Sequence, residues 1–194
     1  PVAARFGKSL CVRGHGRHIP AMTDDFGLFD RARVRRRREL AAGRGDEAEF
    51  LYEEAADRLA DRLLDMNRSF PNALEVGCRK GALARHLPSK AGVERLIGCD
   101  LSPAMARLAG RAGGQPALAA DPEWLPFRED SFDLVLSNLA LHWVEDLPGT
   151  LIQINRALKP DGLFLGALIG GDSLAELRAV MVERRRWRCR MRAP

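Results

Sequence analysis

The sequence lacks paired cysteines and long apolar runs, and each absence argues against a class of protein. Its four cysteines form no C-x-x-C pair and have no set of histidines nearby, so neither a disulfide framework nor a zinc site is indicated. We therefore expect no bound metal and reduced thiols in a cytosol-like compartment. No apolar run reaches the roughly 18 residues that cross a bilayer, so we expect no membrane span.

The positive charge is concentrated in two arginine runs. The chain has a formal net charge of +5, but six arginines lie between residues 31 and 38 and six more between residues 184 and 192. Elsewhere acidic residues outnumber basic ones, so we expect an acidic core domain and no specific nucleic-acid partner. With 194 residues and 46% hydrophobic content, the chain can bury one sizeable core.

The composition divides the chain into four parts. Residues 1–21 carry basic residues, no acid and little hydrophobic periodicity, so we interpret them as a disordered or artefactual extension ahead of Met22. Residues 22–69 are expected to form N-terminal helices, and residues 70–182 the main domain. Residues 183–194 mix arginines with a tryptophan and a cysteine and have no apolar face, which fits either a basic tail or sequence read out of frame.

Short apolar runs alternate with helical patterns along the main domain. Near-continuous apolar strands joined by helices indicate a mostly parallel sheet that is covered by helices on both faces. The right-handed crossover rule then predicts a doubly wound α/β fold. A short basic helix is predicted from Phe26 to about Leu40, ahead of the sheet. The predicted strands cover residues 73–77, 95–100, 116–120, 132–138 and 163–169, and the other predicted helices cover residues 46–66, 81–87, 102–112 and 148–158.

One turn carries the candidate ligand site. The run 73–81 ends a strand with Glu75 and Gly77, and Gly81 then opens a helix. Glycines let the backbone approach a ligand closely, and the N–H groups at a helix start favour an anionic group. About 25 residues after Glu75 a second strand ends in Asp100, near the position at which nucleotide-binding folds hold a ribose. The two features together predict a nucleotide-type cofactor.

Five motifs stand in a fixed order along the main domain. They are Glu75-Val76-Gly77-Cys78, Asp100-Leu101-Ser102-Pro103-Ala104-Met105, Asp121 with Leu125-Pro126-Phe127, Ser131-Phe132-Asp133-Leu134-Val135 and Leu158-Lys159-Pro160-Asp161-Gly162. Together they resemble the class I S-adenosylmethionine-dependent methyltransferases over roughly residues 70–170. The resemblance implies a Rossmann-like methyltransferase sheet and S-adenosylmethionine as the cofactor. That fold normally closes with two further strands, and we expect this chain to lack them because no candidate follows Ile169.

Further segments narrow the resemblance to two branches. Phe29-Asp30-Arg31 with the arginine run, the segment 137–143 and the segment 170–178 are most similar to the mitochondrial complex I assembly factors and their alphaproteobacterial relatives. The biotin-pathway malonyl carrier-protein O-methyltransferases are the other similar branch. The resemblance implies a methyltransferase that acts on a small molecule or a protein. The alternative is a complex I assembly factor, either a protein-arginine hydroxylase or a non-catalytic binding protein, with a respiratory complex I subunit as its partner.

The same resemblance implies a compartment and a set of cofactor contacts. The compartment is the cytoplasm of a bacterium or the mitochondrial matrix of a eukaryote. Asp100 would accept both ribose hydroxyls and Asp121 the adenine amino group, while Gly77 and Gly81 would let the turn approach the methionine portion. Leu101 and Met105 would pack on the adenine, and the set is completed by Glu75, Cys78 and Asn138.

His142 and Trp143 follow the predicted strand 132–138, at the open end of the sheet. The resemblance implies that both lie beside the cofactor and the substrate, where His142 could act as a base on an acidic nucleophile. Alternatively, the two side chains cap the sheet and have a structural role alone. The residue types are compatible with both interpretations.

Two residues depart from the family pattern. Arg79 stands where the family usually has a third glycine, and its side chain would crowd a close approach to the backbone. Pro122 stands where a backbone N–H often meets the adenine, and proline has no N–H. The arginine run has two interpretations. It forms a solvated helix face, or one of its arginines, or else Tyr52 in the next helix, closes over the carboxylate of the cofactor.

Overall fold

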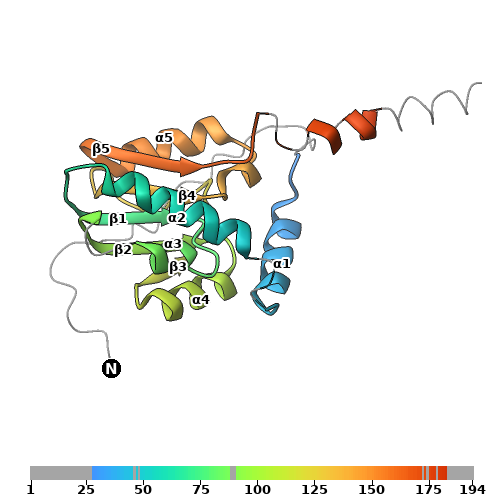
Figure 1. Cartoon of the computed structure of the whole chain (residues 1–194), viewed down its shortest axis with the longest axis horizontal. Coiled ribbons are helices and arrows are strands. Elements are labelled where there is room, and N and C mark those ends of the chain that lie inside the picture. The colour runs from blue at the N-terminus through green and yellow to red at the C-terminus, as the bar shows by residue number, and fades with distance from the viewer. Residues whose placement is uncertain are drawn as a thin grey trace, which may run out of the picture.

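The structure of the chain is a computed structural model that describes residues 28–45, 47, 49–87, 91–171, 173, 175–177 and 179–182. The expected extension at residues 1–21 and the expected tail at residues 183–194 lie outside the described residues. Figure 1 shows a sheet with helices packed against it and α1 across one end. A helical segment after β5 stands away from this body.

Five parallel strands form one sheet in the order β3-β2-β1-β4-β5. The central strand β1 (Phe70–Val76) pairs with β2 (Val93–Asp100) on one side and with β4 (Phe132–Asn138) on the other. The short β3 (Ala117–Ala119) extends the sheet beyond β2, and β5 (Leu158–Ala167) extends it beyond β4. Because all these pairings are parallel, the carboxyl ends of the strands meet at one edge. The predicted doubly wound α/β class is confirmed.

The helices flank the sheet in the order that the crossovers require. Two of them, α1 (Arg31–Ala42) and α2 (Phe50–Leu64), come before β1. The other three follow strands, namely α3 (Ala82–His86) after β1, α4 (Pro103–Gly113) after β2 and α5 (Leu147–Ala157) after β4. A single turn of 3-10 helix, Leu141–Trp143, lies between β4 and α5.

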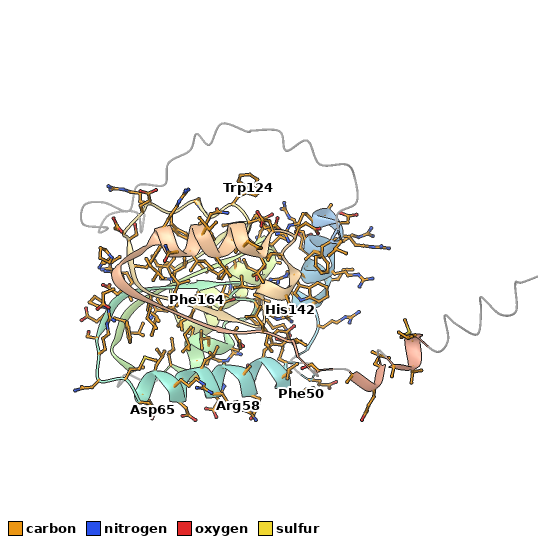
Figure 2. The ribbon with its side chains drawn as sticks, turned by 90° about the horizontal axis from the view of Figure 1, so that it is seen from above. Phe50, Arg58, Asp65, Trp124, His142 and Phe164 are labelled. Carbon is orange, nitrogen blue, oxygen red and sulfur yellow. The ribbon has the colours of Figure 1, made fainter. Side chains whose placement is uncertain are left out.

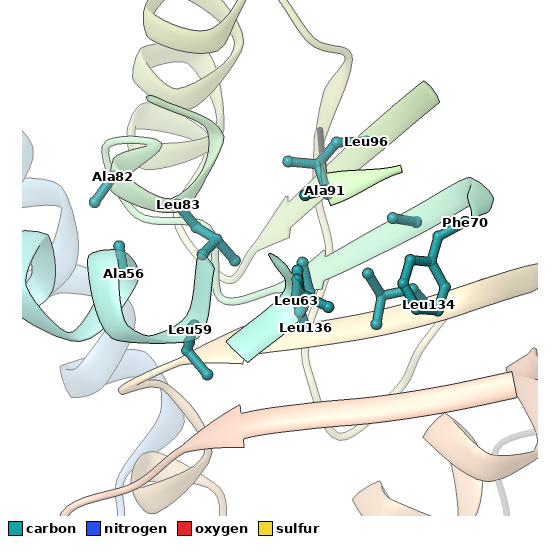
Figure 3. Packing of buried hydrophobic residues seen from close by; sticks show 11 residues of the cluster. Ala56, Leu59, Leu63, Phe70, Ala82, Leu83, Ala91, Leu96, Leu134 and Leu136 are labelled. Carbon is teal, nitrogen blue, oxygen red and sulfur yellow. The ribbon is translucent and has the colours of Figure 1, made fainter. Parts of the chain in front are cut away.

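Alternate residues of the central strands pack on opposite faces of the sheet. In β4, Leu134 and Leu136 belong to a cluster with residues of α2 and α3, whereas Val135 between them packs with Ile154 of α5. This is the period of two that a strand imposes on its side chains. Figure 3 shows the first cluster, in which Leu59 of α2 faces the sheet. Both faces are therefore covered, as the apolar strands predicted.

The largest difference from the predicted elements is the start of β5. This strand begins at Leu158 instead of residue 163, because Leu158 pairs with Phe132 before the turn that follows it. The ladder resumes where Leu163 pairs with Leu134, after a shift in register. The strand prediction missed the first part because a Lys-Pro-Asp-Gly sequence is typical of a turn.

The first helix is also shorter than predicted. It begins at Arg31 instead of Phe26, because Asp30 caps it by accepting a hydrogen bond from the Arg33 N–H at 3.0 Å. At the other end of the chain, the described residues after β5 contain no further strand, and residues 175–177 and 179–182 are helical. Within the described ranges, no helix combines the length and apolar character needed to cross a membrane.

One carboxyl group is buried inside the sheet. Glu75 lies near the carboxyl end of β1 and is only 2% exposed. Burial, and to a smaller extent the charge of Asp100, raises the pKa of this carboxyl from 4.5 to about 8, although the charge of Arg85 opposes the change. The folded protein therefore keeps Glu75 protonated at neutral pH.

Glu75→Gln is expected to remove a pH dependence of stability. Between pH 4.5 and about 8 the unfolded chain has released this proton while the folded chain retains it. The free energy of unfolding of the native sequence therefore falls as the pH rises. Between about pH 5 and about pH 8, the free energy of unfolding of the native chain should fall by about 2–4 kcal/mol more than that of the glutamine variant. Urea unfolding of both proteins at the two pH values measures it, and parallel pH profiles would contradict the assignment.

Candidate functional site

The turn after β1 is held by close packing from its neighbours. Gly77 and Gly81 have φ angles of 81° and 78°, in the left-handed region. A Cβ on Gly77 would overlap the Cβ of Ala140, which follows β4. A Cβ on Gly81 would lie 3.1 Å from the Cα of Ala109 in α4. The N–H of Gly77 also donates to the carbonyl of Cys99 in β2 at 2.8 Å. Both glycines are thus required by backbone conformation and by packing.

Asp100, at the carboxyl end of β2, is fully buried and extensively hydrogen-bonded. Its Oδ1 accepts the N–H of Ser102, the residue that caps α4, at 2.8 Å. Its Oδ2 accepts the backbone N–H of Arg79 at 3.1 Å and Nη1 of Arg38 at 2.7 Å. The predicted ribose acceptor is therefore engaged by an arginine of α1.

Arg79 directs its side chain towards α2, where it also lines the space beneath α1. Its φ of 47° is in the left-handed region, which is consistent with a position where glycine is usual. The guanidinium lies 3.7 Å from the centroid of the Tyr52 ring in α2, and its Nη2 is 3.1 Å from a carboxylate oxygen of Glu49. A cation over an aromatic face and a partly buried ion pair hold it there.

Asp121, the predicted adenine acceptor, also faces an arginine of α1. Arg31 forms a bidentate pair with this carboxylate, with Nε 3.3 Å from Oδ2. Nη1 of Arg31 lies 3.1 Å from Glu123 and donates to the carbonyl of Trp143 at 3.0 Å. Pro122 has no N–H, and the next one, on Glu123, donates to Asp121 at 3.0 Å.

Two segments on which the resemblance rests meet at this edge of the sheet. The ring of Phe29, just before α1, makes an edge contact with Trp143 at 5.7 Å between centroids. The N–H groups of Leu28 and Phe29 each donate to the Glu145 carboxylate at 2.9 Å. Figure 2 shows His142 at the end of the sheet next to α1. The start of α1 is thus fixed against the segment that follows β4.

A cavity of about 240 Å³ remains beneath α1. Two predicted site residues have buried polar atoms without a hydrogen-bond partner among the described residues, namely Oδ1 of Asn138 and Nδ1 of His142. The other end of the Asn138 amide donates to the Tyr52 carbonyl at 2.8 Å, which fixes its orientation. Buried polar atoms of this kind are candidates for contacts with a ligand. The cavity is lined by Val34, Arg37, Arg38, Ala41, Tyr52, Arg79 and Trp143.

The environment of His142 favours the neutral imidazole. Burial lowers its pKa, and the charges of Arg38 and Arg79 lower it further. A neutral imidazole can accept a proton at physiological pH. The centroid of its ring also lies 5.4 Å from that of the Trp143 ring, so His142 packs at the edge of the sheet as well.

The remaining predicted contacts do not line the cavity. Leu101 is half-buried after β2, and Met105 and Cys78 are buried in the core. Burial raises the pKa of the Cys78 thiol far above its usual range and that of the Cys99 thiol to about 12. Both are free thiols. Thiols in this state are poor nucleophiles, so packing accounts for them.

Sequence reasoning did not single out Arg31, Arg38 or Glu123. Arg31 and Arg38 are seven residues apart, which is about two helical turns and places them on the same face of α1. That spacing could have separated them from the other arginines of the run. Glu123 had no comparable pattern, because its role depends on how the loop after β3 folds back towards α1.

A larger cavity lies away from these residues. It has a volume of about 460 Å³ and lies between α2 and the edge strand β5, with Leu165 and Arg58 among its lining residues. None of the predicted cofactor contacts lines it. In the part of the chain that is described, no group of three or more histidine, cysteine or acidic residues is arranged to hold a metal ion.

Comparison with known sequences gives the same family as the motifs. Residues 74–166 match the family described as a methyltransferase domain. The chain is 48% identical over 155 residues to the mitochondrial arginine-hydroxylase NDUFAF5 of Danio rerio, a match that covers 78% of this chain and 48% of that protein. It is 38% identical over 169 residues to the malonyl-[acyl-carrier protein] O-methyltransferase of Methylovorus sp., covering 81% of this chain and 57% of that protein. The chain thus spans about half the length of these relatives.

A solved structure with the same fold is the N-methyltransferase NodS of Bradyrhizobium japonicum, in complex with S-adenosyl-L-homocysteine. The TM-score is 0.59 at 22% sequence identity, and the match covers 69% of this chain and 71% of that one. At this identity the likeness establishes the fold alone. The sequence match, the strand order and the acids at the strand ends agree, and residues 74–166 of this chain form a methyltransferase domain of the matched family.

Proposed function

We propose that the protein is an S-adenosylmethionine-dependent methyltransferase that acts on a small molecule or a protein. The observation that carries the proposal is the position of Asp100. Its carboxylate is buried at the carboxyl end of β2, beside the glycine turn after β1, where folds of this class bind a nucleoside. The unpartnered oxygen of Asn138 and ring nitrogen of His142 leave polar atoms for a ligand at the same edge.

The residues at this edge fit the parts of the cofactor. Asp100 would hold the ribose and Asp121 the adenine amino group, because carboxylates accept hydrogen bonds from both. Leu101 would contact the adenine ring, and the turn from Gly77 to Gly81 would lie along the methionine portion. When bound, S-adenosylmethionine supplies a methyl group on a sulfonium that an electron-rich acceptor can attack in line.

His142 would handle the proton in this reaction. Its imidazole is half-buried, and its lowered pKa keeps it neutral. The unpartnered Nδ1 can therefore take a proton from an acceptor hydroxyl, carboxyl or amine as the acceptor becomes nucleophilic. Trp143, beside it, would shield the reacting atoms from water and contact the substrate.

A second candidate function is favoured by the relatives. The zebrafish protein, at 48% identity, is named an arginine-hydroxylase and mitochondrial. By that likeness the chain would be an assembly factor that acts on, or only binds, a respiratory complex I subunit. It would then work in the mitochondrial matrix, whereas a bacterial methyltransferase would work in the cytoplasm. One fold can support either reaction, so the product distinguishes them.

Asp100→Asn is expected to weaken binding of S-adenosylmethionine by about tenfold or more, because a charged acceptor of the ribose hydroxyls is lost. Isothermal calorimetry with the full chain measures the change. Asp161→Asn is the matched control, since Asp161 is 91% exposed at the opposite edge of the sheet and should leave the affinity unchanged. The absence of binding heat for the native chain at millimolar ligand would refute the cofactor assignment.

Arg79→Gly is expected to raise the affinity for S-adenosylmethionine by about threefold or more, because glycine adopts the left-handed conformation freely and opens the turn. Asp130→Gly is the control, because Asp130 also has a left-handed φ, of 53°, but belongs to the turn before β4. The two variants relieve the same backbone strain. If Arg79→Gly leaves the affinity unchanged in calorimetry, crowding of this turn is the wrong explanation.

Mass spectrometry of a respiratory complex I subunit can distinguish the two candidate reactions. After incubation with the native chain and S-adenosylmethionine, transfer should add the mass of one CH₂ group to the subunit. A gain of one oxygen atom would instead support hydroxylation. An unchanged mass with stable co-purification would support a binding role. Asp100→Asn serves as the control, because its weaker cofactor binding should reduce the methyl gain at subsaturating S-adenosylmethionine.

A further inference from the structure

Helix α1 lies across the predicted nucleoside site and contacts it through one face. Arg31 and Arg38 are separated by two turns, so they point in the same direction from the helix. Arg31 meets Asp121, and Arg38 meets Asp100. These are the two acids assigned above to the adenine and the ribose, and they come from segments that are far from α1 in sequence.

The pairing is selective within the arginine run. The Arg38 side chain is 8% exposed and that of Asp100 is 0% exposed, so this pair is withdrawn from water. Arg35 is exposed and, within the described part of the chain, its one ion pair is with Glu39 of the same helix. Arg33 and Arg36 are exposed and form no ion pair among the described residues. If this helix face were simply solvated, its arginines would not differ in this way in burial and in ion pairing.

The hydrogen bonds at Asp100 leave little capacity for a ribose. Oδ1 accepts the N–H of Ser102, and Oδ2 already accepts both the Arg79 N–H and the Arg38 guanidinium. A carboxylate has about four lone-pair sites and three of those on Asp100 are used, so it can accept both ribose hydroxyls only if one of the present donors leaves. The backbone N–H belongs to the turn itself, which leaves Arg38 as the group that must move.

We propose that α1 is a latch, in which Arg31 and Arg38 occupy the two acids of the nucleoside site and compete with the cofactor for them. The inference rests on the proposed function, because it takes the ligand to be a nucleoside cofactor. The latched state is closed, and binding requires the two guanidinium groups to leave Asp121 and Asp100. The apparent affinity is then the intrinsic affinity multiplied by the fraction of molecules in which α1 is open.

The contacts around the two pairs agree with a latch that releases as a unit. The start of α1 is tied by Phe29 to Trp143 and by backbone bonds to Glu145, on the same side as Arg31. Beyond its end, the carbonyls of Arg44 and Gly45 accept hydrogen bonds from Nζ of Lys80 at 2.8 and 3.2 Å, which fix this segment to the turn after β1. Gly43 caps the helix just before the fixed segment. A hinge at Gly43 would let the helix swing while α2 stays on the sheet.

The experiment compares two double variants that lose the same charge. Arg31→Gln with Arg38→Gln removes the latch, whereas Arg33→Gln with Arg36→Gln changes only exposed positions of the same helix. Calorimetry with S-adenosyl-L-homocysteine, which cannot donate a methyl group, gives the affinities. The first variant should bind at least about tenfold tighter than the native chain, and the second should match the native chain.

Each other outcome has a defined meaning. Equal affinity of both double variants and the native chain would overturn the latch and leave the proposed function standing. Weaker binding by Arg31→Gln with Arg38→Gln would mean that these arginines hold the cofactor, which also overturns the latch. Failure of the native chain and of both variants to bind would refute the proposed function, and the competition with it.

Hydrogen exchange provides a test that does not depend on affinity. Amides of α1 should exchange faster in Arg31→Gln with Arg38→Gln, and also in the native chain when S-adenosyl-L-homocysteine is added. Because Arg38→Gln leaves Asp100 buried without its charged partner, the single variant Arg31→Gln is included, since it changes a partly exposed pair. The α1 amides of Arg31→Gln should also exchange faster than those of the native chain, but by less than in the double variant. Unchanged protection of α1 in all variants would overturn the latch.

Discussion

The negative charge of Asp100 is the constraint on which this edge of the molecule depends. A carboxylate that is withdrawn from water must be hydrogen-bonded and paired, or it becomes protonated. Here three hydrogen-bond donors from different parts of the chain stabilise the Asp100 carboxylate, and each bond fixes the position of the segment that supplies the donor. The Ser102 N–H positions the residue that caps α4, the Arg79 N–H fixes the left-handed turn after β1, and Arg38 brings α1 across 62 residues of sequence to the strand end. The carboxylate proposed to bind the ribose thus also organises this edge of the fold.

The sheet makes this arrangement possible because it brings the strand ends to one place. The register aligns Val76 of β1 with Cys99 of β2, so the turn after β1 and the acid after β2 are neighbours. The tight contact between Gly77 and Ala140 then sets the distance from that turn to the segment after β4. A side chain at Gly77 would separate the two segments, which is a sufficient reason for glycine there without any ligand. The conformation of the turn therefore cannot serve as support for a cofactor, and the acids and unpartnered polar atoms carry that inference.

The predictable part of the structure is the part governed by local pattern. Alternation of apolar runs and helical spacing predicted the strands, with β4 matched at both ends, and the acid at the end of β2 was visible as such. The partner of that acid was not, because six arginines in eight residues differ little in sequence and only the placement of α1 on the sheet selects Arg38. The start of β5 was missed for a related reason: a turn sequence was overridden by pairing between Leu158 and Phe132. Position 79 was recognised as unusual, but its side chain finds Tyr52 and Glu49 only because α2 packs there.

The groups proposed to bind the nucleoside do not decide the reaction. Asp100, Asp121 and the glycine turn lie in the matched domain, and relatives with different printed activities, an arginine-hydroxylase and an O-methyltransferase, align with this same region. Such residues can position a cofactor, but they do not select an acceptor. We expect the selection to come from groups at the same edge of the sheet, namely His142, Trp143 and the arginines of α1. Burial is the first cause of the lowered pKa of His142, and of the two guanidinium groups that lower it further only that of Arg38 would withdraw with α1 and so raise its basicity. Opening α1 would therefore change the proton affinity of His142 at the same moment as it admits the cofactor, which couples binding to chemistry through one helix.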